Sequence, residues 1–257
     1  NIENKLLEKY EFRKISERYQ ENPVYLKEDE KEEIRLIFIN EETINAQYLD
    51  RQFNPKLLIF LSKHKSKSGI PTLSVHTPGN LGDAMLGGLP RKVSISPASA
   101  MKEALKEMVR SRDEMDLEYE VSYECTHHGP SLDVPTMFVE LGSSVKQWRD
   151  VKAAEAVANA AISAALLRDK YPTALGIGGP HYNRKFTRIA LTTETAFGHI
   201  IPKYAVCLLD SEILRQCIER CVEPTEEIIL NWKGIKGFDK KMLMSLLSEV
   251  DLPIRKV

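Results

Sequence analysis

The alternation of strand-like and helix-like segments is the feature that most restricts the fold of this chain. From Val93 onward, short apolar runs alternate with segments whose apolar residues recur every three or four positions. This order is typical of βαβ units, in which helices cover both faces of a sheet. We therefore predict an α/β fold with a mostly parallel or mixed sheet flanked by helices. Because no linker or repeat divides the 257 residues, we predict a single domain over residues 1–257.

Strands are predicted where short apolar runs lie between Gly, Pro or polar residues. They are expected over residues 34–39, 57–61, 72–75, 93–95, 117–121, 134–141, 174–177, 204–209 and 228–232. Helices are expected over residues 1–20, 43–53, 145–170, 210–221 and 239–250, and from Ser96 and Pro97 onward. Residues 57–61 are continuously apolar, which predicts a strand buried on both faces. Residues 145–170 are predicted to form the longest helix.

A polar loop between two of these strands holds the residues with the most evident chemistry. Residues 123–130 read YECTHHGP and place Glu124, His127 and His128 between the strands predicted at 117–121 and 134–141. Loops at strand ends are where α/β proteins keep their functional groups, because the sheet fixes the loop while substrate can still reach it. We therefore predict that the functional site is built around this loop.

The remaining histidines support this interpretation. Three of them lie at or near the ends of apolar runs, beside Gly or Pro: His76, His181 and His199. His64 lies elsewhere, in a basic loop of small residues at 62–69. If the strand-end loops converge, these residues supply more than the three or four ligands that zinc needs. The spacing matches no standard zinc signature, however, and a lone loop histidine is more often structural, so both readings stay open.

Hydrolysis without a metal is an alternative. A histidine can position or deprotonate water while backbone N–H groups in the loops at Gly79, Gly129 and Gly179 stabilise an oxyanion. The chain has no G-x-S-x-G motif, and Cys125 is the only cysteine in the central loop. Burial would make this thiol a packing residue rather than a nucleophile.

The overall charge provides no global attraction to nucleic acids or membranes, because the formal net charge is −1. An anionic partner must therefore use a local basic patch. Three patches are present: Lys63, Lys65 and Lys67; Arg184, Lys185 and Arg188; and Lys233, Lys236, Lys240 and Lys241. Charged loops are usually only solvated. Two of these patches adjoin histidine loops, as phosphate recognition beside a hydrolytic centre would require.

The cysteines and the hydropathy of the chain indicate its compartment. No run approaches the roughly 18 apolar residues of a membrane span, and no secretion signal is visible. The four cysteines include no C-x-x-C pair, which favours reduced thiols and predicts a cytoplasmic protein. Cys217 and Cys221 lie four residues apart on a predicted helix, where we expect core packing.

Four long motifs resemble those of the archaeal and plant type of D-aminoacyl-tRNA deacylase. They are ECTHHGP at 124–130, FVELGSS at 138–144 with Trp148 shortly after, ALGIGGPHY at 174–182 and AFGHIIPKYA at 196–205. Weaker matches at 62–64, 72–80, 97–101 and 232–234 extend the resemblance over nearly the whole chain. Pro180 departs from it, because many members have a further glycine there. The family usually begins with a short strand ahead of the first helix, so we expect that a native N-terminal strand is missing here.

The resemblance implies a fold similar to those of peptidyl-tRNA hydrolase and phosphorylase-like proteins, an association with zinc, and hydrolysis of the ester between a D-amino acid and tRNA. On this basis we predict these catalytic residues: His127, His128 and Glu124. The metal ligands are expected among His76, His127, His128, His181, His199 and Glu140. Substrate contacts are expected at His64, Lys63, Lys65, Gly129, Gly178, Gly179, Arg184 and Lys185. The expected partner is D-aminoacyl-tRNA, bound by a monomer without a membrane or an obligatory protein partner.

This activity fits the residues, because an aminoacyl ester is an activated acyl group. An oriented water, an oxyanion site and a Lewis acid suffice for its hydrolysis. Two rival functions stay open. A zinc peptidase or peptidyl-tRNA hydrolase would act on amide-linked or N-blocked substrates. A non-catalytic tRNA-binding module would bind tRNA with a steep salt dependence and show no turnover.

Overall fold

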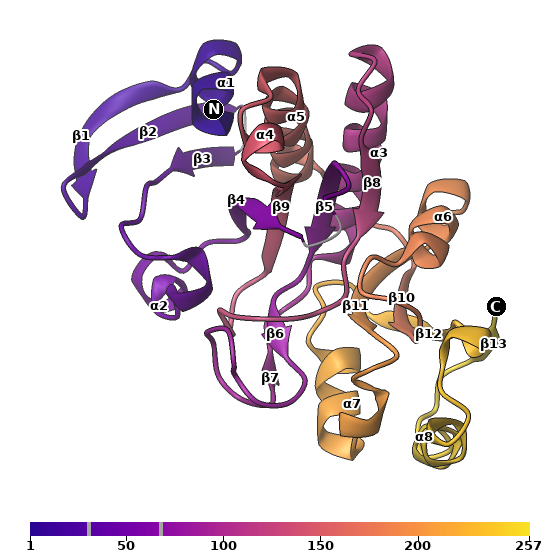
Figure 1. Ribbon diagram of the computed structural model, residues 1–257. Helices are drawn as coiled ribbons and strands as arrows, with labels where there is room; N and C mark the ends of the chain where they lie inside the picture. The colour runs from indigo at the N-terminus through magenta and orange to yellow at the C-terminus, as the bar shows by residue number, and fades with distance from the viewer. Residues whose placement is uncertain (30–31, 67–68) are drawn as a thin grey trace.

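Two four-stranded sheets form the centre of the computed structural model, which describes residues 1–29, 32–66 and 69–257 (Figure 1). The first sheet has the order β4 (Leu58–Lys65), β9 (Thr136–Ser143), β5 (Thr72–His76) and β8 (Glu120–Tyr123). It is mixed, because β9 runs parallel to β4 and antiparallel to β5, while β5 and β8 are parallel. The predicted mixed sheet is therefore confirmed.

The second sheet is entirely parallel. Its order is β11 (Ala196–Ile201), β10 (Thr173–Ile177), β12 (Thr225–Leu230) and β13 (Ile254–Lys256). The segment after β8 joins the two sheets, since the Cys125 N–H donates to the His181 carbonyl and the Thr126 N–H donates to the Ile200 carbonyl. The loop with the two adjacent histidines thus lies where the sheets meet.

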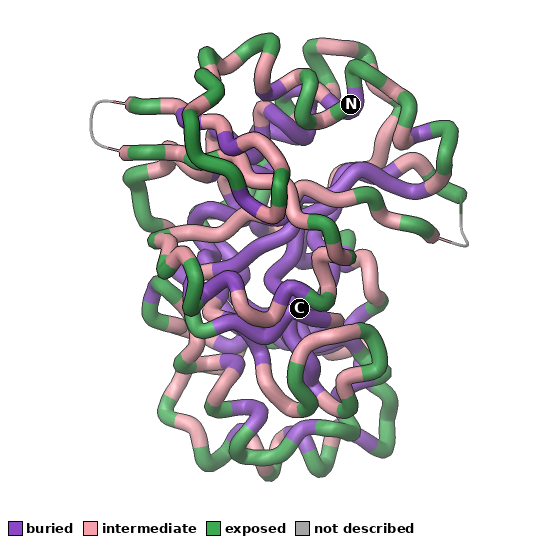
Figure 2. The backbone as a smooth tube through the Cα atoms, turned by 90° about the vertical axis from the view of Figure 1, so that its left-hand side faces the viewer, coloured by how far each residue is buried: buried purple, intermediate pink, exposed green. Residues whose placement is uncertain are grey.

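Helices cover the sheets. The longest is α3 (Ala98–Glu114), which packs on α5 (Val151–Leu166) in the same hydrophobic cluster. Alanines on the buried face of α5 allow this close approach: Ala153, Ala156, Ala160 and Ala164. The second sheet is accompanied by α6 (Arg184–Thr192), α7 (Ser211–Glu219) and α8 (Asp239–Leu247). Figure 2 shows the buried backbone concentrated in the middle of the molecule, where residues of both sheets share one cluster.

Smaller elements complete the fold. An antiparallel sheet of β1 (Arg13–Tyr19), β2 (Asn22–Asp29) and β3 (Glu32–Leu36) follows the first helix, α1 (Ile2–Lys9). A short hairpin pairs β6 (Gly79–Asn80) with β7 (Lys92–Val93). The remaining pieces are helices α2 (Leu49–Phe53) and α4 (Val145–Trp148), with 3-10 turns η1 (Thr43–Asn45), η2 (Val206–Leu208) and η3 (Trp232–Gly234). Within the described parts of the chain, no helix combines the length and hydropathy needed to cross a bilayer.

The α/β class is confirmed, but several predicted segments were wrong. The helix expected over 1–20 ends at Lys9, and a strand follows. The helix expected over 145–170 is divided, because the Asp150 carboxylate caps a new helix by accepting from the backbone N–H groups of Lys152 and Ala153. The strand expected over 204–209 is a turn followed by η2. The preceding strand, β11, ends at Ile201, directly before Pro202, which has no N–H for the sheet.

The basic segment at 62–69 was also misassigned. β4 continues through Ser62, Lys63, His64 and Lys65, paired with β9 along its whole length. It is the edge strand of its sheet and is only partly buried, which is why it is not the doubly buried strand expected at 57–61. Lys67 lies outside the described residues.

Candidate functional site

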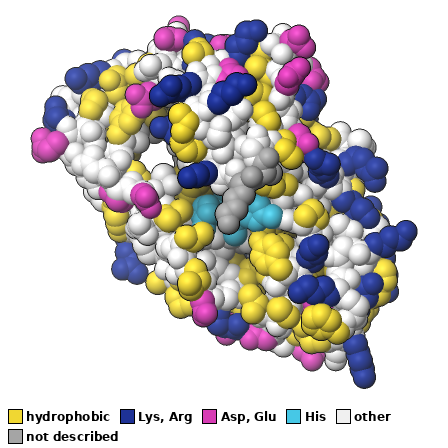
Figure 3. Space-filling view, viewed as in Figure 1, with side chains coloured by type: hydrophobic (Ala, Val, Ile, Leu, Met, Phe, Trp, Pro, Cys, Tyr) yellow, Lys and Arg dark blue, Asp and Glu magenta, His cyan; other side chains and the backbone are white. Residues whose placement is uncertain are grey.

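Five of the six histidines converge where the two sheets meet. They come from four segments: His64 on β4, His76 at the end of β5, His127 and His128 in the loop after β8, and His181 after β10. In Figure 3 the histidines reach the surface together near the middle of one face. Two buried glutamates, Glu124 and Glu140, lie among them.

The parallel pairing of β4 with β9 brings His64 into this site. In this register Ser62 is opposite Glu140 and His64 is opposite Gly142. Because alternate residues of a strand share a face, Ser62 and His64 both approach Glu140. The Ser62 hydroxyl donates to Glu140 Oε1, and His64 Nδ1 lies 3.4 Å from Glu140 Oε2. The sequence contains one hint of a shared face, a serine two residues before a histidine in both 62–64 and 74–76, but this spacing does not show that the face points toward Glu140.

Glu124 is the most heavily partnered carboxylate of the site. It is 1% exposed, and its Oε1 accepts a 2.6 Å hydrogen bond from the Ser74 hydroxyl. His181 Nε2 lies 2.7 Å from Oε2, and His127 Nε2 lies 3.6 Å from the same oxygen. A buried carboxylate requires such partners because burial without them would favour its neutral form. Glu124 therefore holds the loop after β8 against the loop after β10.

Backbone carbonyls fix the tautomers of His127 and His128. His127 Nδ1 lies 2.8 Å from the Cys125 carbonyl, and His128 Nδ1 lies 2.6 Å from the Gly129 carbonyl. A carbonyl oxygen can only accept, so each Nδ1 must carry a proton, which leaves the Nε2 lone pair free when the ring is neutral. Histidines that ligate metals typically donate their other ring N–H to a carbonyl in this way.

His76 is buried, and no described residue forms a hydrogen bond with its ring. It is 1% exposed, and its ring stacks on Phe138 with centroids 5.0 Å apart and an interplanar angle of 10°. The His127 ring lies 4.4 Å away on centroids. Among the described residues, neither ring nitrogen of His76 has a hydrogen-bond partner, and Glu140 Oε2 lies 4.0 Å from His76 Nδ1. Because unpaired buried polar atoms are costly, this donor set fits a bound cation.

The electrostatics divide the histidines into two kinds. Burial, followed by the charge of His128, lowers the pKa of His127 to about 3, and burial also lowers the pKa values of His76 and His128. These three rings are therefore neutral at physiological pH. Burial alone would lower the pKa of His181, but hydrogen bonds to Cys125 and Glu124 overcome it and raise that pKa to about 10.

At Glu124 and His64, as at His181, hydrogen bonds and neighbouring charges outweigh the effect of burial on the pKa. Burial would raise the pKa of Glu124, yet the hydrogen bond from His181 and the neighbouring histidine charges hold it below its usual value. Burial would lower the pKa of His64, and the hydrogen bond to Glu140 with the charge of Glu124 raises it instead. The site thus combines neutral imidazoles with a carboxylate–imidazolium pair.

Three groups of described residues place their ligand atoms within 4.8 Å of one another and could hold a metal. They are His76, His127 and His128; Cys125, His127 and His181; and His64, Glu124 and Glu140. The first group has the strongest chemical case, because it contains the unpartnered His76 and two histidines with fixed tautomers.

His199 lies apart from these groups. It is on β11, fully buried, and both of its ring nitrogens have protein partners: the Thr126 hydroxyl at 3.1 Å and the Arg220 carbonyl at 3.1 Å. It therefore ties the central loop to the end of α7. The expectation that it lies in a strand-end loop was wrong, because the segment 196–201 is itself a strand of the second sheet.

The residues expected to contact substrate lie on three different parts of the fold: β4, the start of α6, and the loops that contain Gly129, Gly178 and Gly179. Lys63 and Lys65 are exposed on β4, while Arg184 and Lys185 begin α6, where Arg184 pairs with Glu120. Gly178 and Gly179 both have positive φ and form the turn before His181. A Cβ on Gly129 would lie 2.2 Å from the Gly88 nitrogen, so this glycine permits a close backbone approach.

Two features of the site were not foreseen. The Tyr204 hydroxyl lies 3.1 Å from His181 Nδ1 and 3.3 Å from Cys125 Sγ, so the thiol, the phenol and the imidazole form one cluster. Tyr204 belongs to the motif at 196–205, which was the only signal for it. His128 has φ of 44°, a left-handed conformation that is uncommon for residues with a side chain.

Comparison with known proteins identifies the family of this chain. The D-aminoacyl-tRNA deacylase family model matches residues 51–255. A D-aminoacyl-tRNA deacylase of Pyrococcus furiosus is 39% identical over 263 aligned residues, covering 100% of this chain and 94% of that protein. One of Thermococcus kodakarensis is 40% identical, covering 98% and 93%, and one of Methanosarcina mazei is 35% identical, covering 100% and 87%.

A solved structure shares the fold of this chain. The crystal structure of a conserved protein of unknown function superposes with a TM-score of 0.87 at 30% identity, covering 99% of this chain and 89% of that one. The family match extends over the strands and loops that carry all five converging histidines. The chain therefore belongs to the D-aminoacyl-tRNA deacylase family.

Proposed function

We propose that this protein hydrolyses the ester bond of D-aminoacyl-tRNA and releases a D-amino acid and free tRNA. The observation that carries the proposal is the partly buried cluster of neutral histidines beside the Glu124–His181 pair, in a chain 35–40% identical to named deacylases. Such an enzyme would recycle tRNA charged with D-tyrosine and similar D-amino acids.

Zinc is the proposed cofactor, held by His76, His127 and His128 with Glu140 close by. Neutral imidazoles are preferred zinc ligands, and the lowered pKa values keep these rings neutral. Zinc bound there would polarise the ester carbonyl and lower the pKa of a water molecule. The same low pKa values make His127 and His128 weak general bases, which favours a ligand role over direct proton abstraction.

The Glu124–His181 pair supplies a proton and a positive charge beside this centre. The carboxylate orients the imidazole through Nε2, and the Tyr204 hydroxyl contacts Nδ1. Since the His181 side chain is 30% exposed, a substrate can reach it. We propose that the imidazolium stabilises the oxyanion formed on the ester carbonyl and delivers a proton to the departing ribose oxygen.

Recognition of the substrate is proposed for the groups around this centre. Rigid backbone at Gly129, Gly178 and Gly179 would contact the Cα substituent and favour one hand of the amino acid. His64, Lys63, Lys65, Arg184 and Lys185 are proposed to contact tRNA. A cytoplasmic location follows from this substrate class, because charged tRNA is made and used there, while the monomeric state and independence of protein partners stay predictions.

Single-turnover deacylation of D-Tyr-tRNA and L-Tyr-tRNA tests the proposal, with untreated protein, chelator-treated protein and treated protein after zinc is restored. We expect rapid loss of the D-ester alone, inhibition by the chelator and recovery with zinc. If neither ester is cleaved faster than in buffer with zinc present, the deacylase proposal fails. Full activity after verified metal removal would instead eliminate the zinc centre and leave hydrolysis without a metal.

A further inference from the structure

We propose that the unpaired 3′ end of the tRNA lies on a surface beside the His181 loop, which we call the lysine–aromatic surface. It consists of Trp232, Lys236, Phe238, Lys240, Lys241 and Lys256. This inference rests on the proposed deacylase function and identifies where the nucleotides next to the ester would bind. The residues of this surface belong to the segment from η3 to α8 and to β13, at the C-terminal end of the chain.

The charge of this surface is not neutralised. Among the described residues, none of its four lysines forms an ion pair with a carboxylate, whereas neighbouring Arg255 pairs with Glu227. The one carboxylate in the sequence from 232 to 241, Asp239, is only 3% exposed. Free lysines around one area raise the local concentration of an anion such as a phosphate backbone.

Aromatic rings are interleaved with these lysines. Phe238 is 75% exposed, with Lys236 Nζ 5.7 Å from its ring centroid. The Trp232 ring contacts Lys240 Nζ at 4.7 Å and Lys256 Nζ at 4.1 Å. A single exposed apolar side chain is ordinary, but rings combined with cations are the arrangement that binds single-stranded nucleic acid. Bases stack on the rings while phosphates lie near the cations.

The backbone connects this surface to the catalytic cluster. The Gly179 N–H donates to the Gly234 carbonyl over 3.1 Å, so η3 packs on the turn that precedes His181. His181 is two positions after Gly179 and Phe238 is four positions after Gly234, so these stretches of backbone span at most about 7 Å and about 14 Å. The surface is therefore within the reach of a few nucleotides from the ester. In Figure 3, Lys and Arg side chains gather to the right of the histidines on the same face.

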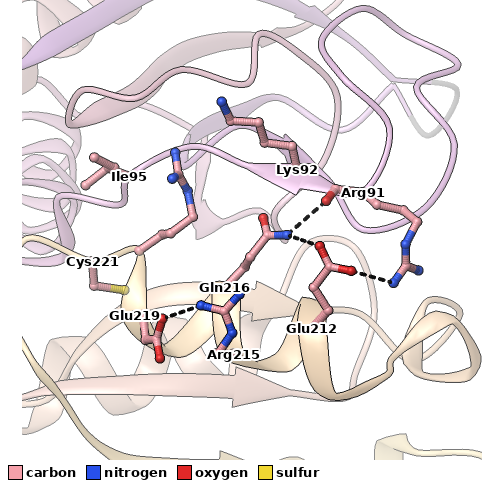
Figure 4. A pocket seen from close by; sticks show the side chains of 9 residues that line it. Arg91, Lys92, Ile95, Glu212, Arg215, Gln216, Glu219 and Cys221 are labelled. Atoms are coloured by element: carbon pink, nitrogen blue, oxygen red, sulfur yellow. Dashed lines mark hydrogen bonds and ion pairs between the residues drawn. The ribbon is translucent and has the colours of Figure 1, made fainter.

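The rival anion site is a groove of about 600 Å³ between α7 and the β6–β7 hairpin (Figure 4). Its cationic side chains are all neutralised: Arg91 pairs with Asp210, Lys92 and Arg220 pair with Asp133, and Arg215 pairs with Glu219. A phosphate entering the groove would have to displace these carboxylates. The groove therefore offers less attraction to RNA than the free lysines do.

The test compares two double variants with equal changes in charge. Lys236→Glu/Lys241→Glu alters the proposed surface, and Lys14→Glu/Lys170→Glu alters two exposed lysines on β1 and after α5. For uncharged tRNA(Tyr), we expect the first pair to raise Kd about 10- to 100-fold relative to the second. We also expect the slope of log K against log salt to fall in magnitude by about 2, one counterion for each lost lysine.

The aromatic contribution is tested separately. Phe238→Ala should weaken tRNA binding about 5- to 100-fold, whereas Phe238→Trp should retain it because a stacking ring remains. All four variants should hydrolyse the minimal ester D-tyrosyl-adenosine at the wild-type rate, since it lacks the nucleotides before the terminal adenosine that this surface is proposed to bind.

The outcomes separate the two proposals. If the Lys236→Glu/Lys241→Glu protein is folded and binds tRNA(Tyr) as tightly as the Lys14→Glu/Lys170→Glu protein, the lysine–aromatic surface is rejected. Equal affinities of Phe238→Ala and wild type would reject stacking. If wild type hydrolyses neither D-Tyr-tRNA nor D-tyrosyl-adenosine, the deacylase function fails, while the binding comparison still tests the surface.

Discussion

His181 contacts the Glu124 carboxylate through Nε2 at 2.7 Å, and this contact adds a side-chain link to the backbone bond between Cys125 and His181 that joins the loop after β10 to the loop after β8. The carboxylate contributes to the raised pKa of His181, which is about 10. Glu124→Gln should therefore move this pKa down toward 6.5, because an amide carries no charge to hold the proton. NMR titration of the His181 Cε1 proton in metal-free protein measures the shift. A value that stays near 10 would mean that Cys125 and Tyr204 hold the proton.

The same pair predicts how stability depends on pH. The raised pKa of His181 stabilises the fold fully below the unfolded value of 6.5, and this stabilisation is lost as pH rises through about 10. The lowered pKa of Glu124 stabilises the fold above its unfolded value of 4.5, and this is lost as pH falls. The difference in free energy of unfolding between wild type and Glu124→Gln/His181→Gln should thus be largest between about pH 4.5 and 6.5. Urea unfolding of metal-free proteins at pH 5.5 and 9.5 tests this, and a larger difference at pH 9.5 would contradict it.

His76 and His199 form a matched pair for testing the metal centre. Both are buried, but within residues 1–29, 32–66 and 69–257 only His76 lacks protein partners for its ring nitrogens. His76→Gln should lose zinc, measured by elemental analysis of the purified protein, with the circular dichroism spectrum retained. His199→Gln should keep its zinc and lose about 1–3 kcal/mol of stability, because it disrupts buried hydrogen bonds. Equal zinc loss in the two variants would refute this ligand assignment.

Gly129 is expected to be essential for the shape of the central loop. An added Cβ would lie 2.2 Å from the Gly88 nitrogen and 2.5 Å from the Ile44 carbonyl oxygen, both of them backbone atoms. Gly129→Ala should therefore lower the free energy of unfolding by about 1–3 kcal/mol and reduce deacylation. Gly237→Ala is the control, since no atom of the described part of the chain lies within 4 Å of a Cβ there. Comparable stability of the two variants in urea would show that the loop can adjust.

Cys125 contacts a histidine, as an activated thiol would, but its sulfur is not accessible to substrate. Its sulfur lies 3.2 Å from His181 Nδ1, while the residue is 0% exposed. We expect Cys125→Ala to retain single-turnover deacylation of D-Tyr-tRNA within about threefold, because a buried sulfur cannot attack the ester. A loss of more than about 100-fold, together with a thioester trapped on the wild-type protein, would make Cys125 the nucleophile.

The sequence predicted the fold best where the apolar pattern of a segment matches its burial in the sheets. The loop at 124–130 could be placed because apolar strands flank it on both sides, and β5, β9, β10 and α7 lie close to their predicted positions. His76 directly follows the predicted strand at 72–75 and His181 follows the predicted strand at 174–177. The ends of these strands were therefore a sufficient guide to both histidines.

His64 shows why the rest could not be predicted. Alternating lysines on an edge strand look like a solvated loop, and only the pairing with β9 reveals that His64 faces Glu140. The β1–β2 hairpin was hidden for a related reason. Its turn uses Gln20 and Glu21 at positive φ, where glycine or asparagine would have signalled a turn. The α6 helix was hidden in a threonine-rich stretch, although Asn183 caps it by accepting from the Phe186 N–H.

The left-handed backbone at His128 sets a limit on engineering this protein. A residue with a Cβ pays roughly 1 kcal/mol to adopt φ of 44°, and glycine would avoid that cost. Selection for heat resistance alone would therefore favour replacing a side chain that the proposed chemistry needs. A thermostable variant of this scaffold should be sought by changes outside the loop, with position 128 held constant.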